Sequence, residues 1–153
     1  MVEDLEQSVL FRGFSVLQLS EIEPFCTLLV LEDGELLIQE SDHDDRDLYL
    51  LCRGGVEIVS NDSQATSSEV VISKADNELY GEMAWLSGKK RTASVRCHGG
   101  VEAIRIDGDA LLEYFRRYPD LGFLFMHRLA VLLSQRLSDA SSLLKQVLWN
   151  STL

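Results

Sequence analysis

The sequence is poor in positive charge. Its 153 residues include 14 lysines and arginines against 25 aspartates and glutamates, which gives a formal net charge of −11 at pH 7. A protein that binds duplex nucleic acid needs a broad basic patch on its surface, and this composition cannot easily build one. We therefore expect no nucleic-acid partner, and any anionic ligand must be small and met by a local group of cations.

Cysteine is equally scarce, and its spacing excludes two kinds of site. The chain has three cysteines, Cys26, Cys52 and Cys97, an odd number with no CxxC pair. This spacing suits neither a zinc site nor a disulfide framework. Each cysteine lies in an apolar run, so we expect small buried hydrophobic residues in a reducing, cytoplasmic environment.

Long hydrophobic runs are missing too. No apolar stretch reaches the roughly 18 residues that a membrane-spanning helix needs. Residues 1–6 are acidic, where a signal peptide begins with basic residues. The sequence therefore predicts a soluble chain with no signal peptide and no direct insertion into a membrane.

Histidine is too sparse for a metal-dependent enzyme. The three histidines are His43 in an acidic loop, His98 at a turn and His127 in a late helix. A metal held inside a roll of strands, as in cupin oxygenases, needs two or three histidines with a carboxylate on facing strands. No Ser/His/Asp or Cys/His arrangement is evident either. We expect no metal, no catalytic residues and no enzyme activity.

What the chain does have is the composition of a folded domain. Hydrophobic residues make up 46% and charged residues 25%, which is typical of globular proteins and not of disordered ones. This length suits one domain with its own core. We expect a single domain over residues 1–153, with a helical segment at about 10–25, strands over 26–107 and helices over 109–150.

The first helix has a recognisable start and stop. Ser15 and Gln18 fit a capping box, in which each side chain accepts a hydrogen bond from the other residue's backbone N–H. Pro24 ends the helix or kinks its last turn. The pattern predicts a short helix over residues 15–24.

Short apolar runs separated by turn residues fill the middle of the chain, and they predict roughly seven strands. Gly54-Gly55 and Gly99-Gly100 each stand between two such runs, which predicts two hairpins. Residues 81–86 interrupt the strands as a single helical turn. Closely connected strands with helices on either side indicate a mainly β fold with flanking helices, an antiparallel β-roll or jelly roll.

From Asp109 onward the apolar period becomes helical. Asp109 is a suitable N-cap for a first helix, and Pro119 stands where a second begins. The second helix is expected to continue to about Leu148. Its apolar residues alternate in spacings of four and three, a heptad seam, made of Met126, Ala130, Leu133, Leu137, Ala140, Leu144 and Val147.

Residues 79–97 read LYGEMAWLSGKKRTASVRC and gather three consecutive cations in this acidic chain. A phosphate diester needs a planar, permanently charged donor, and Arg91 offers two parallel hydrogen bonds. Gly81 opens a short helical turn and lets an anion approach the main chain. Glu82 only accepts hydrogen bonds, which suits a sugar hydroxyl beside the phosphate.

Two parts of this stretch, Tyr80–Leu86 and Arg91–Val95, together resemble the phosphate-binding cassette of cyclic nucleotide-binding domains, with residues 79–95 as the cassette. The family pattern is Phe-Gly-Glu-aliphatic-Ala, a short loop, and then Arg-Ala/Ser/Thr-Ala-Ser/Thr-aliphatic. The sequence RTASVR is most similar to channel members of the family. The resemblance extends from about Leu10 to Leu137 and implies a double-stranded β-helix-like roll that binds cAMP or cGMP.

The resemblance also implies a role for each cassette residue. Arg91 would pair with the exocyclic phosphate oxygens, and Glu82 would accept from the ribose 2′-hydroxyl. Thr92 would offer a hydroxyl near the phosphate or the base, and Ala93 would leave room for the nucleotide. The other implied ligand-binding residues are Tyr80, Gly81, Met83 and Ala84, with Gly81 and Met83 offering backbone groups.

Other interpretations of the same residues stay open. Glu82 and Arg91 could form a structural ion pair that closes a loop without a ligand, and Thr92 could be an ordinary strand residue. The chain would then be a degenerate, nucleotide-free domain that acts in protein–protein interaction or dimerisation. Lys89 and Lys90 either lie in a solvated turn or help to attract the anion.

We expect a regulatory module with a cyclic nucleotide as its ligand and no cofactor. Ligand occupancy would be transmitted through the C-terminal helix by a shift between two populations.

Thirty helical residues span about 45 Å, more than the roughly 15 Å radius of gyration of such a domain. The seam over residues 126–147 therefore predicts a homodimer or a partner helix; the alternative is a bent helix that folds back as a lid. The chain could also belong to a larger transporter, channel or regulator.

Overall fold

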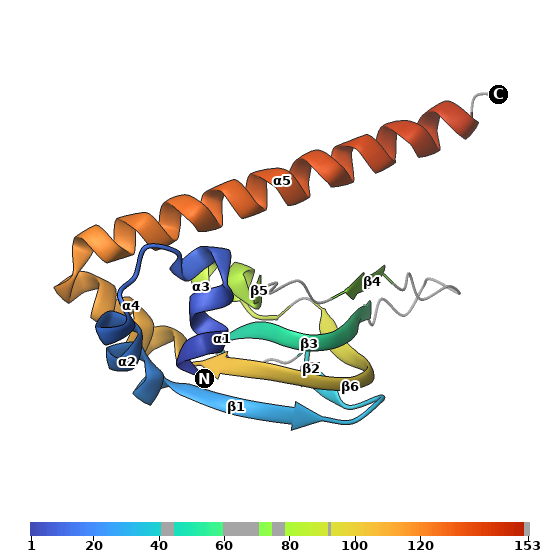
Figure 1. The fold of residues 1–153 in the computed structure, drawn as a ribbon. Helices are drawn as coiled ribbons and strands as arrows, with labels where there is room; N and C mark the ends of the chain where they lie inside the picture. The colour runs from blue at the N-terminus through green and yellow to red at the C-terminus, as the bar shows by residue number, and fades with distance from the viewer. Residues whose placement is uncertain (41–44, 60–70, 75–78, 92, 152–153) are drawn as a thin grey trace.

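The strands form a roll with helices at one end and a long helix above it (Figure 1). The computed structural model describes residues 1–40, 45–59, 71–74, 79–91 and 93–151, with residues 71–74 by their backbone. The predicted class, an antiparallel β-roll with flanking helices, is confirmed.

Two long antiparallel strands, β3 (Leu48–Val59) and β6 (Ser94–Ile106), form the centre of the sheet. Each pairs with different short strands along its length: β6 pairs with β1 and β2, and β3 pairs with β4 and β5. Because the partners change along the long strands, the sheet closes into a roll. The short strands are β1 (Cys26–Leu31), β2 (Leu36–Ile38), β4 (Val71–Lys74) and β5 (Leu79–Tyr80).

The two predicted Gly-Gly hairpins are wrong. Gly54 and Gly55 lie inside β3, and Gly99 and Gly100 lie inside β6, so both strands continue through their glycine pairs. Gly54 has φ +97°, and a Cβ there would lie 2.3 Å from the carbonyl oxygen of Gly100. The pairing register of β3 with β6 shifts at this point. The glycines therefore allow two strands to bend and approach closely, a second reason for Gly-Gly besides a turn.

The N-terminal helices lie at one end of the roll. The capping box of α2 (Val16–Ile22) is confirmed, because Ser15 Oγ accepts from Gln18 N at 3.2 Å and Gln18 Oε1 accepts from Ser15 N at 2.9 Å. The 3₁₀ turn η2 (Glu23–Phe25), with Pro24 near its start, ends the helical segment as expected. The other elements here are α1 (Val2–Gln7) and η1 (Val9–Phe11).

The helix α4 (Gly108–Arg117) begins two residues earlier than its predicted cap. Asp107 is the N-cap, and its Oδ1 accepts from Ala110 N at 2.9 Å. Asp109 was predicted as the cap, but it lies in the first turn, where a carboxylate is favoured by the helix dipole. Both aspartates suit a helix start, so composition alone does not separate them.

Side chains alternate between two apolar cores along the central strands, as the pleat of a strand requires. Leu48 and Leu50 point to a core shared with the helices. Tyr49 and Leu51 point to a second core inside the roll. The candidate site borders this second core, whose members include Ile38, Tyr80 and Val95.

The cysteines are less uniformly buried than the sequence predicts. Cys97 is buried, whereas Cys26 and Cys52 are half-buried, and all three are free thiols. Burial raises the pKa of Cys26 to about 12 and that of Cys52 to about 11. Both thiols therefore stay protonated at neutral pH and are poor nucleophiles.

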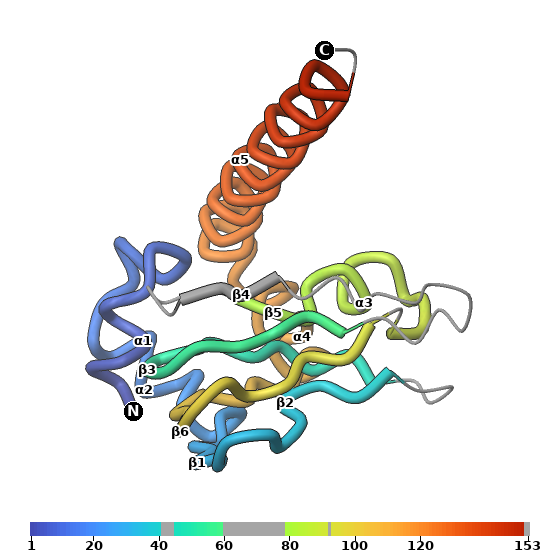
Figure 2. Tube along the Cα trace, turned by 90° about the vertical axis from the view of Figure 1, so that its right-hand side faces the viewer, coloured from blue at the N-terminus to red at the C-terminus, as the bar shows by residue number. Residues whose placement is uncertain are grey.

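The helix α5 (Pro119–Ser151) extends beyond the roll. It is one continuous helix, and both views show its C-terminal half leaving the rest of the molecule (Figure 1 and Figure 2). All residues over 137–151 are exposed. Leu144, Val147 and Leu148 are exposed on this overhanging end, and the helix does not bend back as the lid that the sequence left as an alternative. No helix in the described part of the chain is apolar enough over a sufficient length to cross a membrane.

Candidate functional site

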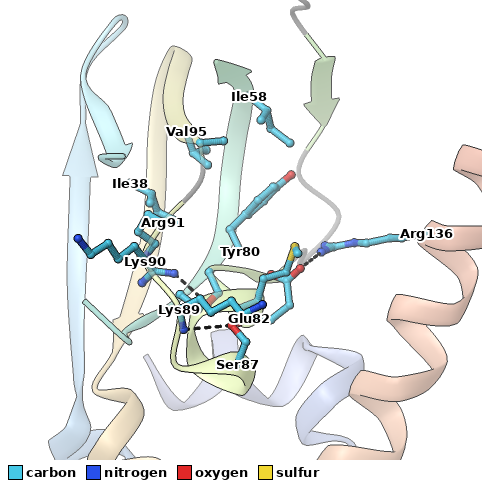
Figure 3. Close-up of a pocket in the computed structure, with 14 residues that line it drawn as sticks. Ile38, Ile58, Tyr80, Glu82, Ser87, Lys89, Lys90, Arg91, Val95 and Arg136 are labelled. Atoms are coloured by element: carbon cyan, nitrogen blue, oxygen red, sulfur yellow. Dashed lines mark hydrogen bonds and ion pairs between the residues drawn. The ribbon is translucent and has the colours of Figure 1, made fainter. Parts of the chain in front are cut away.

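A cavity of about 410 Å³ opens where α3 (Glu82–Ser87) meets the roll and α5 passes nearby (Figure 3). Its wall is largely apolar on the side of the roll, and its charged residues come from α3, from the segment that follows α3 and from α5. The apolar part includes Ile38 from β2, Ile58 from β3 and Val95 from β6. Strand alternation directs these residues inward, although the sequence analysis did not assign them to a site.

Seven of the predicted site residues line this cavity together. They are Tyr80, Gly81, Glu82, Met83, Ala84, Arg91 and Ala93. Thr92 lies outside the described residues. These residues lie up to 13 positions apart in the sequence, from Tyr80 to Ala93, and they line the same cavity. A binding cassette requires such an arrangement.

Gly81 allows the chain to turn closely around Arg91. Its φ is +87°, and a Cβ there would lie 2.6 Å from Arg91 Nη1 and 2.7 Å from the carbonyl oxygen of Asp47. The positive φ is the left-handed conformation that glycine adopts without strain. The carbonyl oxygen of Gly81 accepts from Arg91 Nη1 at 2.8 Å, so the turn and the arginine position each other.

The side chain of Arg91 is buried at the edge of the cavity. Its side chain is 4% exposed. Nη2 donates to the Asp47 carbonyl oxygen at 2.6 Å and lies 3.3 Å from Asp45 Oδ1. Nε is buried and has no hydrogen-bond partner among the described residues. A buried polar group without a partner is costly, so an acceptor that reached this N–H would be stabilising.

Glu82 is paired with a residue that the sequence analysis missed. Its Oε1 accepts from Arg136 Nη1 of α5 at 3.1 Å, and the Glu82 side chain is 10% exposed. Among the ion pairs of the described residues, Glu82 pairs with Arg136 and Arg91 pairs with Asp45. The alternative of a structural pair between Glu82 and Arg91 is therefore wrong.

Arg136 links α5 to the cassette at two further points. Its Nη2 donates to the Leu79 carbonyl oxygen at 2.7 Å, and its guanidinium carbon lies 5.7 Å from the centre of the Tyr80 ring. Such a cation over an aromatic face is favourable. The sequence signal that could have indicated Arg136 was a basic residue on a predicted helix that is long enough to reach the cassette.

Positive charge gathers at the cavity although the chain is acidic. Lys89, Lys90, Arg91 and Arg136 line it, whereas Glu82 is the one carboxylate among its described lining residues. Both lysines are exposed, as expected for a solvated turn, and both also border the cavity. Asp45 and Glu82 offset part of the charge of Arg91 and Arg136, and the remaining excess of cations in the lining would attract a small anion.

A second layer of contacts joins Arg91 to the start of α4. Asp47, whose carbonyl oxygen holds Arg91, accepts from Arg105 Nε at 2.6 Å and from Gly108 N at 3.3 Å through its carboxylate. The indole of Trp85 in α3 donates to the Gly108 carbonyl oxygen at 2.8 Å. Arg91, which lines the cavity, and the start of α4 are therefore joined by hydrogen bonds through Asp47 and Gly108.

The described residues do not form a metal centre. No group of three or more histidine, cysteine, aspartate or glutamate side chains in the described part of the chain is placed to hold a metal ion.

A roll with a cassette of this geometry defines a class of ligand-binding regulatory domain. The chain belongs to the cyclic nucleotide-binding domain family, because the model of that family matches residues 28–118. The predicted family is confirmed. This family is one of regulatory, generally non-enzymatic domains that take a cyclic nucleotide as ligand.

Among curated proteins, the chain is similar to the cyclic nucleotide-gated channel beta-3 of the dog, Canis lupus familiaris. The two are 28% identical over 94 residues, which make up 60% of this chain and 12% of the channel. The chain therefore spans a small fraction of the length of the curated relatives that it matches.

Solved structures show the same fold. The catabolite activator protein of Thermus thermophilus is 24% identical, with a TM-score of 0.67 over 90% of this chain and 62% of that chain. The regulatory domain of Toxoplasma gondii PKA, solved with cAMP, is 16% identical, with a TM-score of 0.66 over 90% of this chain and 48% of that chain.

Proposed function

We propose that this chain is a regulatory module that binds cAMP or cGMP in the cavity beside α3 and reports occupancy through α5. The observation that carries the proposal is Arg91, a buried guanidinium at a largely apolar cavity with an unused N–H among the described contacts. The cyclic phosphate supplies acceptor oxygens and a single negative charge, which complement that group.

The sugar would bind at Glu82. Its carboxylate accepts hydrogen bonds and is mostly buried, so a ribose 2′-hydroxyl is a suitable donor. Tyr80, Gly81, Met83 and Ala84 would form the rest of this side of the site, with backbone groups of Gly81 and Met83 facing the ligand. Ala93 would leave room beside the phosphate, and Thr92 would contribute a hydroxyl.

Two contact paths support transmission from the ligand to the C-terminal helices. The first runs from Glu82 to Arg136 on α5. A ligand that donates a hydrogen bond to the Glu82 carboxylate would change the strength of the hydrogen bond that this carboxylate accepts from Arg136. The second runs from Arg91 through Asp47 to Gly108 at the start of α4. A ligand shifts such an equilibrium by as much as it binds one arrangement better than the other.

The exposed end of α5 would bind a second copy of the chain or a partner helix. Leu137, Leu144 and Val147 are 70%, 59% and 56% exposed and lie on the heptad seam. An apolar stripe of this length is costly to leave in water. Ala140 on the same seam lets two helices approach closely.

The effector would be another part of a longer protein or a separate partner. The channel relative contains a matching segment that is 12% of its length, which supports the idea of a module that controls a larger assembly. Three free cysteines suit a reducing compartment, so we place the module in the cytoplasm.

The decisive experiment is a calorimetric titration of the whole chain with cAMP and with cGMP. We expect saturable binding of at least one nucleotide with one site per chain. Absence of heat and of thermal stabilisation with both nucleotides would overturn the proposal. It would favour the nucleotide-free alternative, in which the same fold acts in protein–protein interaction or dimerisation.

A further inference from the structure

We infer that the strand β1 is a docking site for an extended segment of a partner protein, in which basic residues precede alternating apolar ones. The inference does not depend on the proposed function. In both views β1 lies on the side of the roll opposite to α5 (Figure 1 and Figure 2), and none of its residues lines the cavity beside α3.

The strand β1 forms an edge of the sheet. Among the described strands it pairs with β6 alone, and no labelled element lies beyond it in either view (Figure 1 and Figure 2). An edge strand has a row of backbone N–H and C=O groups that another extended chain can pair with, and natural edges usually carry a lysine, a proline or a bulge that prevents this. β1 reads CTLLVL and pairs with β6 without a register shift. It therefore lacks these protective features.

The register of β1 with β6 identifies the backbone groups that face the open edge. Asp107 N donates to the Phe25 carbonyl oxygen at 2.9 Å, so Phe25 is hydrogen-bonded towards β6. Residues 26–31 continue this ladder without a shift. In an antiparallel ladder, pairs that exchange hydrogen bonds alternate with pairs that do not, so every second residue after Phe25 also faces β6. Leu28 and Val30 lie between those residues and direct their N–H and C=O groups to the open edge.

Backbone groups at both ends of this edge already have partners. Cys26 N–H donates to a carbonyl oxygen of the 3₁₀ turn η2. Glu32 N donates to Glu35 Oε2 at 2.6 Å, and the Glu32 carbonyl oxygen accepts from Glu35 N at 3.2 Å. The open part of the edge is thus centred on Leu28 and Val30, a length that suits a short extended segment.

The side chains at the open part of the edge are apolar and exposed. Leu28 is 50% exposed and Val30 is 72% exposed. They lie on the same face of the sheet, because they stand two residues apart on one strand. An added strand would place its own alternate side chains beside them, and cross-strand pairs of apolar residues stabilise a sheet. The backbone would therefore provide binding, and these two side chains would favour an apolar partner.

Acidic residues beyond the end of β1 define the charge of the partner. Glu32, Asp33 and Glu35 are exposed, and none of them pairs with a cation among the ion pairs of the described residues. In an antiparallel complex the N-terminal end of the added segment lies beside them, so lysine or arginine is favoured there. A second copy of β1 is disfavoured, because it would bring its own Glu23 to this place.

The test titrates the whole chain with the fluorescein-labelled peptide acetyl-KKTVTVTV-amide and follows fluorescence anisotropy. We expect saturable binding with a dissociation constant in the micromolar range. The matched control is acetyl-EETVTVTV-amide, which has the same strand but an acidic start. It should bind at least about tenfold more weakly, because like charges would then face each other.

The variant Val30→Pro tests the backbone contact. Proline is tolerated on an edge strand where its missing N–H would face outward, so the pairing of β1 with β6 should remain. Loss of this donor should weaken binding of the basic peptide by about tenfold. Val30→Thr keeps the N–H and the branched shape and is the control, which should bind within a few-fold of wild type.

Amide hydrogen exchange, measured by NMR on the wild-type chain, tests the same geometry without a substitution. The N–H groups of Leu28 and Val30 should exchange fast in the free chain and slowly with the basic peptide bound. The N–H of Leu29, which faces β6, should exchange slowly in both states and serves as the internal control.

Several results would overturn the inference: no binding of the basic peptide, equal binding of the acidic one, or binding that leaves the exchange of Leu28 and Val30 unchanged. Unweakened binding by a folded Val30→Pro chain would do the same. Protection of both amides in the free chain that increases with protein concentration would assign the edge to a second copy instead. Cyclic nucleotide binding is measured separately, so failure of the proposed function would leave this test intact.

Discussion

Arg136 of α5 donates to Glu82 of α3 across 54 positions of sequence, with Nη1 and Oε1 3.1 Å apart. It is the last residue of α5 that is not exposed, because every residue over 137–151 is exposed. The pair thus lies directly before the stretch of α5 whose residues are all exposed. A ligand that meets Glu82 acts at the point where α5 leaves the roll.

The first prediction concerns the sugar. If Glu82 accepts from the 2′-hydroxyl, a 2′-deoxy cyclic nucleotide should bind the wild-type chain more weakly by about 1–3 kcal/mol, the cost of losing a hydrogen bond to a charged group. In Glu82→Gln this preference should shrink, since the amide is a weaker acceptor. Glu113→Gln, an exposed glutamate on α4, is the control. Titration of the three proteins with both ligands decides it, and an undiminished preference in Glu82→Gln would assign the sugar to another residue.

The second prediction concerns the phosphate. Arg91→Ala should weaken cyclic nucleotide binding by about 2–5 kcal/mol, as is typical when one member of a buried charge pair is removed. Arg91→Lys should recover part of this loss, because it keeps the charge without the planar fork. Arg53→Ala removes an arginine that is 76% exposed on β3 and serves as control. Equal dissociation constants for wild type and Arg91→Ala would contradict the assignment, provided that circular dichroism shows both to be folded.

The cassette could be predicted because its parts are local. Gly81, Glu82 and Arg91 lie within 11 positions of each other, and short-range chemistry defines them: a positive φ, a carboxylate and a planar cation. The capping box of Ser15 and Gln18 was predictable for the same reason. Patterns of this kind depend on residues that are close in the sequence, so they can be predicted from the sequence alone.

The contacts that the sequence did not reveal are long-range or ambiguous. Arg136 reaches Glu82 because of the direction of α5, and Asp45 and Asp47 reach Arg91 across more than 40 positions. The periodicity of apolar residues predicts a helix or a strand, but it does not predict the direction in which that element runs relative to the others. The glycine pair at Gly54 has two physical uses, a turn and a close approach of strands, and the sequence signal is the same for both.

The third prediction concerns stability in acid. Glu57 of β3 lies opposite Arg96 of β6, and the hydrogen bond from Arg96 lowers the pKa of Glu57 below its ordinary value of 4.5. A carboxyl with a lower pKa in the folded chain adds stability above its unfolded pKa, and this stability is lost as the pH falls through the folded pKa. Glu57→Gln should therefore be less stable than wild type at neutral pH.

In acid, the difference between Glu57→Gln and wild type should shrink. Urea midpoints measured from neutral pH down through the range below pH 4.5 test this, with Glu3→Gln in α1 as the control for removal of one exposed carboxylate. A difference that stays constant with pH would mean that Glu57 contributes by packing and not by its charge.

The last prediction concerns the overhanging end of α5. Its seam continues past Arg136 with Leu137, Leu144 and Val147 exposed, and two copies placed along this seam would cover one another's apolar residues. We expect the wild-type chain to sediment as a dimer at micromolar concentration. Leu137→Glu and Leu144→Glu should each shift it to monomer, because they place a charge in the middle of the interface.

Ser142→Glu is the matched control for these two variants, since it adds the same charge to an exposed residue of α5 that is not part of the seam. It should remain a dimer. The roll should be unaffected in all three variants, because residues 137–151 are exposed and do not belong to either apolar core. A wild-type monomer at micromolar concentration would exclude self-association, and the seam would then require a helix from a different protein or from another part of a longer chain.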